Sequence, residues 1–319
     1  MPQGSEAVAW LNDEAAARTA QSARRSLWGA APEIVRRVHD KAFAQRLAQR
    51  EGLQPAPLRG VVQVLEPGAL RPDDAGVEAI ARCLEALPAW ARESFTLKPR
   101  LGSSGRGRVA GSAGVADTPA IRGALGRLAA RGGALLEPWL QRREDLSAQL
   151  LVEPDGAVRL LGTTMLEVTP AGVYRGQRGL VDAMGRVVSG SEHDEALREA
   201  AAIAAAASAA EGFRGPCSVD AFSFEAPEGS VFRPLVEFNA RFSAGLVTIG
   251  LLRQQIAVLR RHFAPHPEQR IAFHFRLSMP SAWSRHDDEI LALPLGTHGA
   301  GLACASSADA LKRALGRES

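Results

Sequence analysis

The sequence predicts an α+β protein built from antiparallel hairpins and helices. Segments 147–161 and 217–242 each read as two alternating strands around a turn, Pro154-Asp155-Gly156 in the first and Pro227-Glu228-Gly229 in the second. The Ala-rich segment 196–210 between them is a strong helix former. Because hairpins predominate over strand–helix–strand units, the class is α+β rather than α/β.

The other elements are predicted from Pro and Gly residues that mark element boundaries and from hydrophobic periodicity. A helix is expected from about residue 33 to residue 50, after Pro32, and a buried strand is expected over 61–65, before Pro67-Gly68. The remaining predicted helices are an Ala-rich helix within 5–30, helices over 77–87, 118–131 and 245–263, and a closing helix from 307. The remaining strands cover 95–99 and 134–139, with one short strand in the tail 270–319.

Composition indicates a soluble globular protein and excludes several other classes. Hydrophobic residues make up 46% of the 319 residues, and 38 Lys and Arg nearly balance 35 Asp and Glu, so nothing favours a nucleic-acid partner. No run is long and apolar enough to predict a membrane span, and no secretory signal is visible. The three widely spaced cysteines predict a reduced, cytoplasmic setting, and the Ala-, Gly- and Arg-rich composition suggests a bacterial source.

A carboxylate, an amide and a guanidinium alternate along the last predicted strand of the second hairpin. Glu237, Asn239 and Arg241 are two residues apart, so their side chains point to one face. Asp220 lies in an apolar run on the other arm, where a carboxylate is costly unless it is paired or bound to a metal. Asp, Glu and Asn oxygens suit a hard cation, so these residues indicate a magnesium site. The alternative is a pair of buried, salt-bridged acids.

Lys98 ends an apolar strand and precedes the glycine-rich loop Gly102-Ser103-Ser104-Gly105-Arg106-Gly107. Glycines allow a close backbone approach, so the N–H groups of Ser103, Ser104 and Gly105 are candidates for cradling phosphate oxygens. The spacing is not that of a P-loop, and a flexible surface hairpin is the alternative. Only three lysines occur in the chain, and Lys41 and Lys98 are two of them.

Together these motifs resemble the ATP-grasp superfamily, whose members mostly join a carboxylate to an amine at the expense of ATP. The resemblance implies two α+β lobes whose antiparallel sheets clasp ATP. It implies a short N-terminal segment (1–40), a small lid lobe (41–137), and a large lobe with the metal site and a C-terminal extension (138–319).

The resemblance also implies an ATP- and Mg²⁺-dependent carboxylate–amine ligase, with Mn²⁺ as a substitute metal. The acid would attack the γ-phosphorus to give an acylphosphate and ADP, and an amine would then displace phosphate. The alternatives are an ATP-dependent phosphotransferase on the same fold and a nucleotide-binding protein without turnover.

Roles for single residues follow from the same resemblance. Lys98, and Lys41 in Asp40-Lys41, would contact the nucleotide phosphates; for Lys41 the alternative is an exposed helix lysine. The segment Glu137-Pro138-Trp139-Leu140 is similar to the hinge whose backbone pairs with adenine while apolar side chains enclose the ring. Asp145, or Glu144 one residue earlier, would hold the ribose hydroxyls.

The remaining roles concern the reacting groups. Asp220, Glu237 and Asn239 would hold Mg²⁺ at the β- and γ-phosphates. Arg241 would lie near the transferred γ-phosphoryl group or the acceptor carboxylate, because a guanidinium binds either in a bidentate manner. A structural ion pair with Glu237 is the alternative for Arg241, and Arg175 is a weaker candidate on the phosphate side.

The chain departs from the family pattern before Lys41. Residues 1–40 show no clear strand–helix–strand series, so the pre-grasp domain that helps to bind the acceptor is expected to be truncated. A homodimer partner or another protein would then complete the acceptor pocket, or the acceptor is large, such as a peptide or a carrier-linked acid. The sequence identifies neither the acid nor the amine.

Overall fold

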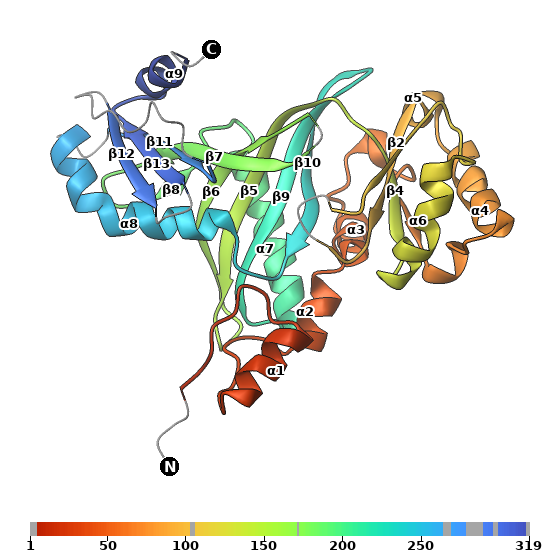
Figure 1. The fold of residues 1–319 in the computed structure, drawn as a ribbon. Helices are drawn as coiled ribbons and strands as arrows, with labels where there is room; N and C mark the ends of the chain where they lie inside the picture. The colour runs from red at the N-terminus through yellow and green to blue at the C-terminus, as the bar shows by residue number, and fades with distance from the viewer. Residues whose placement is uncertain are drawn as a thin grey trace. The chain divides into compact units, whose positions relative to one another are not determined.

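The computed structural model describes residues 5–102, 106–170, 172–263, 269–278, 290–295 and 299–316. The chain divides into two compact units, each assembled from separate stretches of sequence. Unit 1 comprises Met1–Val35, Glu144–Ala221 and Asn239–Ser319, and unit 2 comprises Arg36–Arg143 and Phe222–Phe238 (Figure 1). The division at 40/41 and 137/138 expected from the sequence stays a prediction of domain organisation.

Within its described residues, unit 2 contains a four-stranded antiparallel sheet in the order β1-β4-β2-β3. Leu97 and Leu136 pair across β2 and β4 and are both fully buried, as the apolar pattern of the two segments predicts. Ile80 and Leu125 from two helices pack in the same core. The elements are α2 (Pro32–Val38), α3 (Lys41–Arg50), η1 (Ala56–Leu58), β1 (Gln63–Leu65), η2 (Pro67–Ala69), α4 (Asp74–Glu85), α5 (Ala89–Arg92), β2 (Ser94–Pro99), β3 (Val109–Ser112), α6 (Pro119–Ala130) and β4 (Ala134–Pro138).

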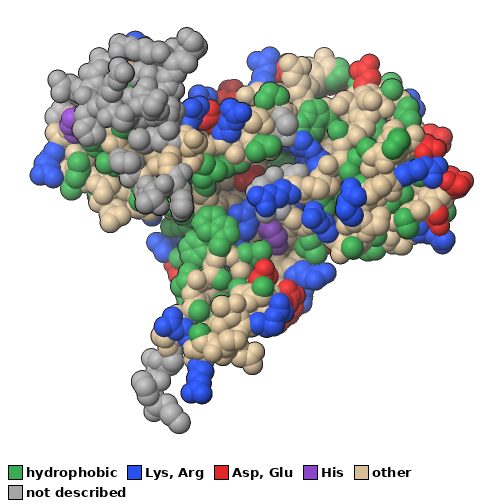
Figure 2. All heavy atoms as spheres, in the orientation of Figure 1, with side chains coloured by type: hydrophobic (Ala, Val, Ile, Leu, Met, Phe, Trp, Pro, Cys, Tyr) green, Lys and Arg blue, Asp and Glu red, His purple; other side chains and the backbone are tan. Residues whose placement is uncertain are grey.

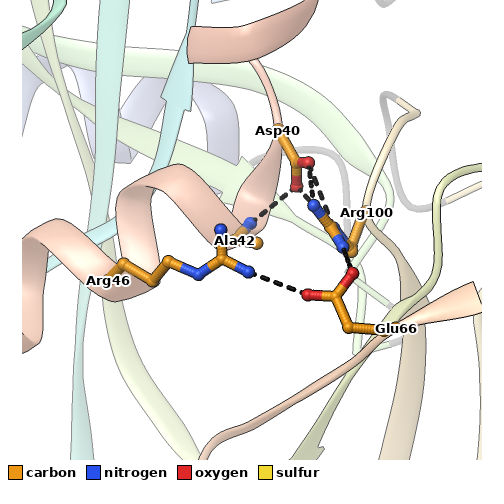
Figure 3. Close-up of polar contacts among 5 residues, drawn as sticks. All are labelled: Asp40, Ala42, Arg46, Glu66 and Arg100. Carbon is orange, nitrogen blue, oxygen red and sulfur yellow. Dashed lines mark hydrogen bonds and ion pairs between the residues drawn. The ribbon is translucent and has the colours of Figure 1, made fainter.

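The predicted helix over 33–50 is wrong as a single element, because Asp40 divides it. The Asp40 carboxylate accepts a hydrogen bond from the Ala42 backbone N–H (2.8 Å) and so begins α3. The same carboxylate accepts from Arg100, whose guanidinium also reaches Glu66, and Arg46 of α3 donates to Glu66 (Figure 3). This network joins the start of α3 to the end of β2 and therefore fixes the residue that follows the cap, Lys41.

The described residues also form a nine-stranded sheet in the order β10-β9-β5-β6-β8-β7-β11-β13-β12. From β5 to β12, the pairings β5–β6, β6–β7, β7–β8, β7–β11, β11–β13 and β12–β13 are antiparallel, and one parallel bridge joins β6 to β8. Strand β10 ends at Asn239, before the end predicted at residue 242, and β7 was not predicted. The elements are β5 (Arg142–Val152), β6 (Val158–Val168), β7 (Tyr174–Val181), β8 (Val187–Val188), α7 (Asp194–Ala210), β9 (Gly215–Ala226), β10 (Gly229–Asn239), α8 (Ala244–Phe263), β11 (Ile271–Arg276), β12 (Ile290–Leu295), β13 (Ala300–Ala305) and α9 (Ala308–Gly316).

Two helices of unit 1 pack on opposite faces of β11, because side chains alternate along a strand. Ile271 and Phe273 share a buried core with Ile249 of α8, whereas Ala272 packs with Leu311 of α9. None of the helices in the described part of the chain combines the length and the hydropathy that a bilayer crossing requires.

The N-terminal segment of unit 1, residues 5–35, is held by polar contacts. Helix α1 (Glu14–Ser22) begins at Asp13, whose side chain accepts from the Ala16 N–H (2.8 Å). The Asn12 side-chain amide donates to the carbonyls of Trp28 (2.8 Å) and Ala30 (3.0 Å), and the Ala30 N–H donates to the Arg214 carbonyl (2.8 Å). The segment is therefore fixed against the strand region that begins after Arg214.

Candidate active site

Glu137, on β4 in unit 2, is a buried carboxylate paired with two cations. It is 4% exposed and forms an ion pair with Lys98 of β2, while Arg233 of β10, 2% exposed, places Nη1 3.0 Å from Glu137 Oε2. Burial alone would raise the pKa of Glu137, but the charges and hydrogen bonds of Lys98 and Arg233 outweigh it and hold that pKa well below its usual range. Burial lowers the pKa of Lys98, and the Glu137 charge opposes this. Glu137 is therefore held as an anion.

Lys41 joins the start of the glycine-rich loop to Glu237. Its ammonium donates to the Gly102 carbonyl (2.9 Å) and lies 3.0 Å from Glu237 Oε1. Burial would raise the pKa of Glu237, but Lys41 and His39 outweigh it and lower that pKa. Lys41 is thus a half-buried, paired lysine rather than an exposed helix lysine, and unit 2 brings Lys41, Gly102 and Glu237 together. Ser103, Ser104 and Gly105, predicted to cradle phosphate, lie outside the described residues.

Trp139, in the predicted hinge, carries guanidinium groups over its ring. The Arg108 Cζ lies 4.2 Å and the Arg142 Cζ 5.5 Å from the ring centroid, within the range of cation–π attraction. The Trp139 N–H donates to the Ser94 carbonyl (2.7 Å), so this amide is committed to backbone pairing in unit 2. Leu140 packs against the buried cluster that contains Phe222. This part of unit 2 therefore combines flat aromatic surface with positive charge.

Asp220 and Asn239, both in unit 1, are hydrogen-bonded to each other. Asn239 Nδ2 donates to Asp220 Oδ2 (2.9 Å), and Ser147 Oγ on β5 donates to Asp220 Oδ1 (2.8 Å). Asn239 is 3% exposed, so its amide is held in place by these contacts. A carboxylate and an amide predicted from separate strands therefore do converge.

A chain of polar side chains continues from Ser147 to the start of α8. Gln149 Nε2 donates to Ser147 Oγ (2.8 Å), and Ser243 Oγ donates to Gln149 Oε1 (2.5 Å) while accepting from the Leu246 N–H (3.1 Å). A Cβ at Gly245 would lie 2.4 Å from Gln149, so this close approach needs glycine. The helix cap and the Asp220 contact thus belong to one network.

Arg241 follows β10 and contacts the same network. Its Nη2 donates to Asn239 Oδ1 (3.1 Å) and its Nη1 to the Phe242 carbonyl (3.0 Å). The buried Nε has no hydrogen-bond partner among the described residues. Within unit 1, the contacts of Arg241 are with Asn239 and the Phe242 backbone, and the ion pair with Glu237 stays an alternative.

No family model matches the chain, and no curated protein matches it. Solved structures do match. The biotin carboxylase domain dimer of Hydrogenobacter thermophilus 2-oxoglutarate carboxylase, in complex with MgADP, ADP and bicarbonate, is 15% identical with a TM-score of 0.57, over 96% of this chain and 71% of that chain. N5-carboxyaminoimidazole synthase of Aspergillus clavatus, with ADP and 5-aminoimidazole ribonucleotide, is 15% identical with a TM-score of 0.58, over 97% and 80%.

A third structure, a biotin carboxylase from Campylobacter jejuni in a β-γ-ATP complex, is 15% identical with a TM-score of 0.56, over 92% of this chain and 68% of that chain. The chain has the ATP-grasp fold. The likeness extends over nearly the whole chain, so it includes both units. At this level of identity it establishes the fold, and the chemistry has to be argued from the residues.

Three further residues predicted for the nucleotide lie in unit 1 of this ATP-grasp fold. Glu144 accepts a hydrogen bond from Ser191 Oγ (2.7 Å), and Asp145 is the next residue on β5, where its side chain points to the other face. The Arg175 side chain on β7 is exposed. Its backbone carbonyl accepts a hydrogen bond from the Leu277 N–H (3.1 Å). The choice between Glu144 and Asp145 for the ribose stays open.

The predicted metal ligands of the ATP-grasp fold have suitable chemistry. Among the described residues no group of three or more His, Cys, Asp and Glu side chains gathers as a metal site. Asp220 carries two carboxylate oxygens. Asn239 turns its Nδ2 toward Asp220, and its Oδ1, an oxygen of the kind that Mg²⁺ takes, accepts a hydrogen bond from Arg241. Glu237 belongs to unit 2, where it is paired with Lys41. The donor set therefore fits a hard cation in ligand type.

Sequence reasoning missed Arg233, Ser147 and Gln149. Arg233 lies in the apolar run Val231-Phe232-Arg233-Pro234-Leu235, four residues before Glu237, so the two side chains point to the same face of the strand. A charged residue in such a run indicates that it has a buried partner. Ser147 and Gln149 alternate with buried Ala148 and face Asp220's network. Polar residues at alternate positions of an apolar strand were the available signal.

Tyr174 was also missed. It is the only tyrosine of the chain, and its buried hydroxyl has no hydrogen-bond partner among the described residues. Burial, together with the charges of Asp220 and Glu167, raises its pKa well above the usual range, so the hydroxyl stays protonated. Tyr174 is therefore an available donor in the neighbourhood of Asp220.

Proposed function

We propose that this protein is an ATP- and Mg²⁺-dependent ligase that joins a carboxylic acid to an amine. The observation that carries the proposal is the hydrogen-bonded set Asp220, Asn239 and Arg241 on an ATP-grasp fold. Carboxylate, amide and guanidinium in direct contact are suited to a cation and a transferred or acceptor anion. The similar structures contain MgADP with bicarbonate in one case and ADP with an amine, 5-aminoimidazole ribonucleotide, in another.

The nucleotide is assigned to the residues around Lys41 and Lys98. Both ammonium groups would pair with phosphate oxygens, and Ser103, Ser104 and Gly105 would donate backbone N–H groups. Glu137 supports this role because its negative charge opposes the lowering of the Lys98 pKa by burial. Trp139 and Leu140 would enclose adenine beside Glu137, Asp145 or Glu144 would hold the ribose, and Arg175 would add positive charge near the phosphates.

The metal is assigned to Asp220, Glu237 and Asn239. When bound, Mg²⁺, or Mn²⁺ in its place, neutralises the β- and γ-phosphate oxygens. On the protein side, hydrogen bonds at both ends of the Asn239 amide fix its orientation, with Oδ1 toward Arg241 and Nδ2 toward Asp220. Glu237 would be the second carboxylate ligand of the cation, and Lys41, which pairs with it in unit 2, would contact phosphate.

The proposed reaction has two steps, phosphoryl transfer to the acid and then attack by the amine. A carboxylate oxygen attacks the γ-phosphorus, the bond to the β-phosphate oxygen breaks, and ADP leaves. The amine nitrogen then attacks the acylphosphate carbon, loses a proton, and expels phosphate with formation of an amide. Arg241 would hold the acid through its guanidinium, and the enzyme contributes positioning and charge stabilisation. A cytoplasmic location is part of the proposal and is supported by three unpaired cysteines in the described residues.

The test is release of ADP and phosphate from ATP and Mg²⁺, screened over pools of acids with and without amines. Release that requires both an acid and an amine is the expected result. Release with an acid or alcohol alone, with a stable phosphorylated product, would identify the phosphotransferase instead. Binding of ATP without release under any pool would favour a nucleotide-binding protein without turnover.

A variant tests the metal assignment in the same assay. Glu237→Gln is expected to lower Mg²⁺-dependent release by about 100-fold or more, because it removes one negative ligand. Its circular dichroism spectrum should match that of the wild type. Near-normal release from Glu237→Gln would show that Glu237 does not hold the metal.

A further inference from the structure

Asp40 and Arg100 form a largely buried ion pair in unit 2. The Arg100 guanidinium places Nη2 2.6 Å from Asp40 Oδ2 and Nε 3.0 Å from both carboxylate oxygens (Figure 3). The two side chains are 16% and 12% exposed, respectively. A guanidinium that meets a carboxylate through two N–H groups fixes the orientation of both, so this pair is a rigid contact between α3 and the end of β2.

The pair surrounds Lys41, the first residue of α3. The Lys41 backbone N–H donates to the Arg100 carbonyl (3.2 Å), and its ammonium donates to the Gly102 carbonyl (2.9 Å), two residues further along the chain. The Asp40 carboxylate also accepts from the Ala42 N–H (2.8 Å). The residues on either side of Lys41 are therefore fixed by the same carboxylate that holds Arg100.

Arg100 is in turn tied to the sheet that carries Lys98. It follows the last residue of β2, and its N–H donates to the Gly133 carbonyl before β4 (3.0 Å). A Cβ at Gly133 would collide with the Leu65 carbonyl oxygen and would lie 3.1 Å from Arg100 Cδ, so this close packing needs glycine. The position of Lys41 is thus coupled to the strand of Lys98.

Glu66 extends the pair to the surface of unit 2. It accepts from Arg100 Nη1 (2.6 Å) and from Arg46 Nη2 (2.8 Å). Glu66 and Arg46 are each 58% exposed, and Lys and Arg side chains gather on the surface over α3 (Figure 2). Because water screens exposed charges, this outer contact is expected to matter less than the contact between Asp40 and Arg100.

We propose that Asp40 and Arg100 are a positioning pair for the nucleotide phosphates. They hold Lys41 in the position where its ammonium meets the phosphates, and they act through Lys41 rather than on the nucleotide. The inference rests on the proposed function, which assigns Lys41 and Lys98 to the phosphates. Because the backbone around Lys41 is already ordered in the free protein, less conformational entropy is lost when ATP binds.

The test is binding of ATP by calorimetry and of adenosine by saturation-transfer NMR, both with the full chain. Asp40→Asn is the informative variant, because asparagine still caps a helix while the charge that attracts Arg100 is lost. It should weaken ATP binding by about tenfold, since Lys41 is displaced, and should leave adenosine binding unchanged, since adenosine has no phosphate. Arg100→Met should do the same, and Arg100→Lys should restore part of the affinity.

Asp73 and Arg71 are the matched control in unit 2. Asp73 caps α4 by accepting from the Gly76 N–H (3.2 Å), and it accepts from Arg71 Nε (2.9 Å), so it repeats both roles of Asp40 at another helix. Asp73→Asn and Arg71→Met should therefore leave ATP binding unchanged. Glu66→Gln, at the exposed end of the network, should change it by less than about twofold.

A double variant tests whether the pair acts through Lys41. Lys41→Ala should lose at least as much ATP affinity as Asp40→Asn, and Asp40→Asn combined with Lys41→Ala should bind ATP no more weakly than Lys41→Ala alone. Additive losses in the double variant would overturn the inference. Equal weakening of ATP and adenosine binding in Asp40→Asn would also overturn it, because the pair would then be merely structural.

The inference and the proposed function fail in different ways. Weak ATP binding in Lys41→Ala together with wild-type ATP binding in Asp40→Asn and Arg100→Met would overturn the positioning pair and support the nucleotide assignment. ATP affinity that depends on all three residues, with no ADP release for any pool of acids and amines, would overturn the ligase and leave the positioning pair supported. Wild-type ATP affinity in Lys41→Ala would remove Lys41 from the nucleotide site and overturn the inference with it.

Discussion

Glu137 in unit 2 and Asp220 in unit 1 are both carboxylates on strands, yet their surroundings differ in charge. Glu137 is neutralised by the cations Lys98 and Arg233. Asp220 accepts hydrogen bonds from Ser147 and Asn239, which are neutral. The first arrangement locks an ion inside a core, and removing a partner would leave an uncompensated charge. The second orients a carboxylate through hydrogen bonds from two uncharged side chains.

The comparison teaches that an acidic residue in an apolar strand can indicate either a buried ion pair or a hydrogen-bonded carboxylate at a binding site. Arg233, which is 2% exposed, shows that the Glu137 cluster contributes to structure as well as to any nucleotide site. The Asp220 network ends in Ser243 at the cap of α8 and in the open donor of Arg241. We therefore expect unit 2 variants at the cluster to lose stability and unit 1 variants at Asp220 to lose activity.

Asp220→Asn gives the largest expected effect. Loss of the negative charge should lower Mg²⁺-dependent ADP release by about 1,000-fold, since a carboxylate ligand of the cation is removed. The free energy of unfolding should change by less than about 1 kcal/mol, because an amide oxygen still accepts from Ser147. Steady-state ADP release and urea unfolding measure the two quantities. Asp155→Asn, in an exposed turn of unit 1, is the control, and a fully active Asp220→Asn would break the comparison.

Arg233→Met should have the opposite profile. It leaves Glu137 buried with one cation fewer, so the free energy of unfolding should fall by about 3 kcal/mol in urea titrations. Arg143→Met is the matched control, because the Arg143–Glu225 pair has side chains 61% and 33% exposed and should change stability by less than about 1 kcal/mol. An equal fall in the free energy of unfolding in the two variants would show that burial does not determine how much these ion pairs contribute to stability.

Lys98→Ala sharpens the comparison by testing whether a residue of the Glu137 cluster also binds ATP. It should weaken ATP binding by about 10- to 100-fold in calorimetry, because a charge assigned to the phosphates is lost. Lys98→Ala also removes a cation from Glu137, so its free energy of unfolding is expected to fall as in Arg233→Met, while the remaining Arg233 pair should keep the protein folded without denaturant. Lys312→Ala, at an exposed lysine of α9, is the control for removing a positive charge. Unchanged ATP affinity in Lys98→Ala would remove this lysine from the nucleotide site.

The smallest expected effect is a pH dependence of stability. Because the pKa of Glu137 is lowered by folding, its contribution is present above the unfolded pKa, near 4.5, and is lost as pH falls toward the lower folded value. Glu137→Gln should therefore be less stable than the wild type at pH 7, and the difference should narrow by about 1 kcal/mol as pH falls below the unfolded pKa. Urea midpoints at a series of pH values measure it. A difference that stays constant with pH would show that the carboxylate charge is not the stabilising group.

Much of the fold follows from local patterns. The two hairpins, the Ala-rich helix and most other helices were predicted because periodicity and turn residues act over a few positions. Asp40 divides a helix that the apolar pattern alone joins, since its side chain caps α3 and also holds Arg100, 60 residues away. Tyr174 and its strand were missed because Gly-rich, Arg-containing β7 has no clear alternation.

The sequence by itself determined the α+β class and placed Glu237 and Asn239 on alternate positions of β10, because side-chain direction in a strand follows from backbone geometry. Only the tertiary structure decided which groups these residues meet. Arg233 lies 96 residues from Glu137, and Ser147 lies 73 residues from Asp220. Trp10 and Phe242 also come from distant parts of the chain, and they meet where the Phe242 N–H donates to the Trp10 carbonyl (3.0 Å). Such partners meet only when the whole core closes, since no local rule links positions so far apart.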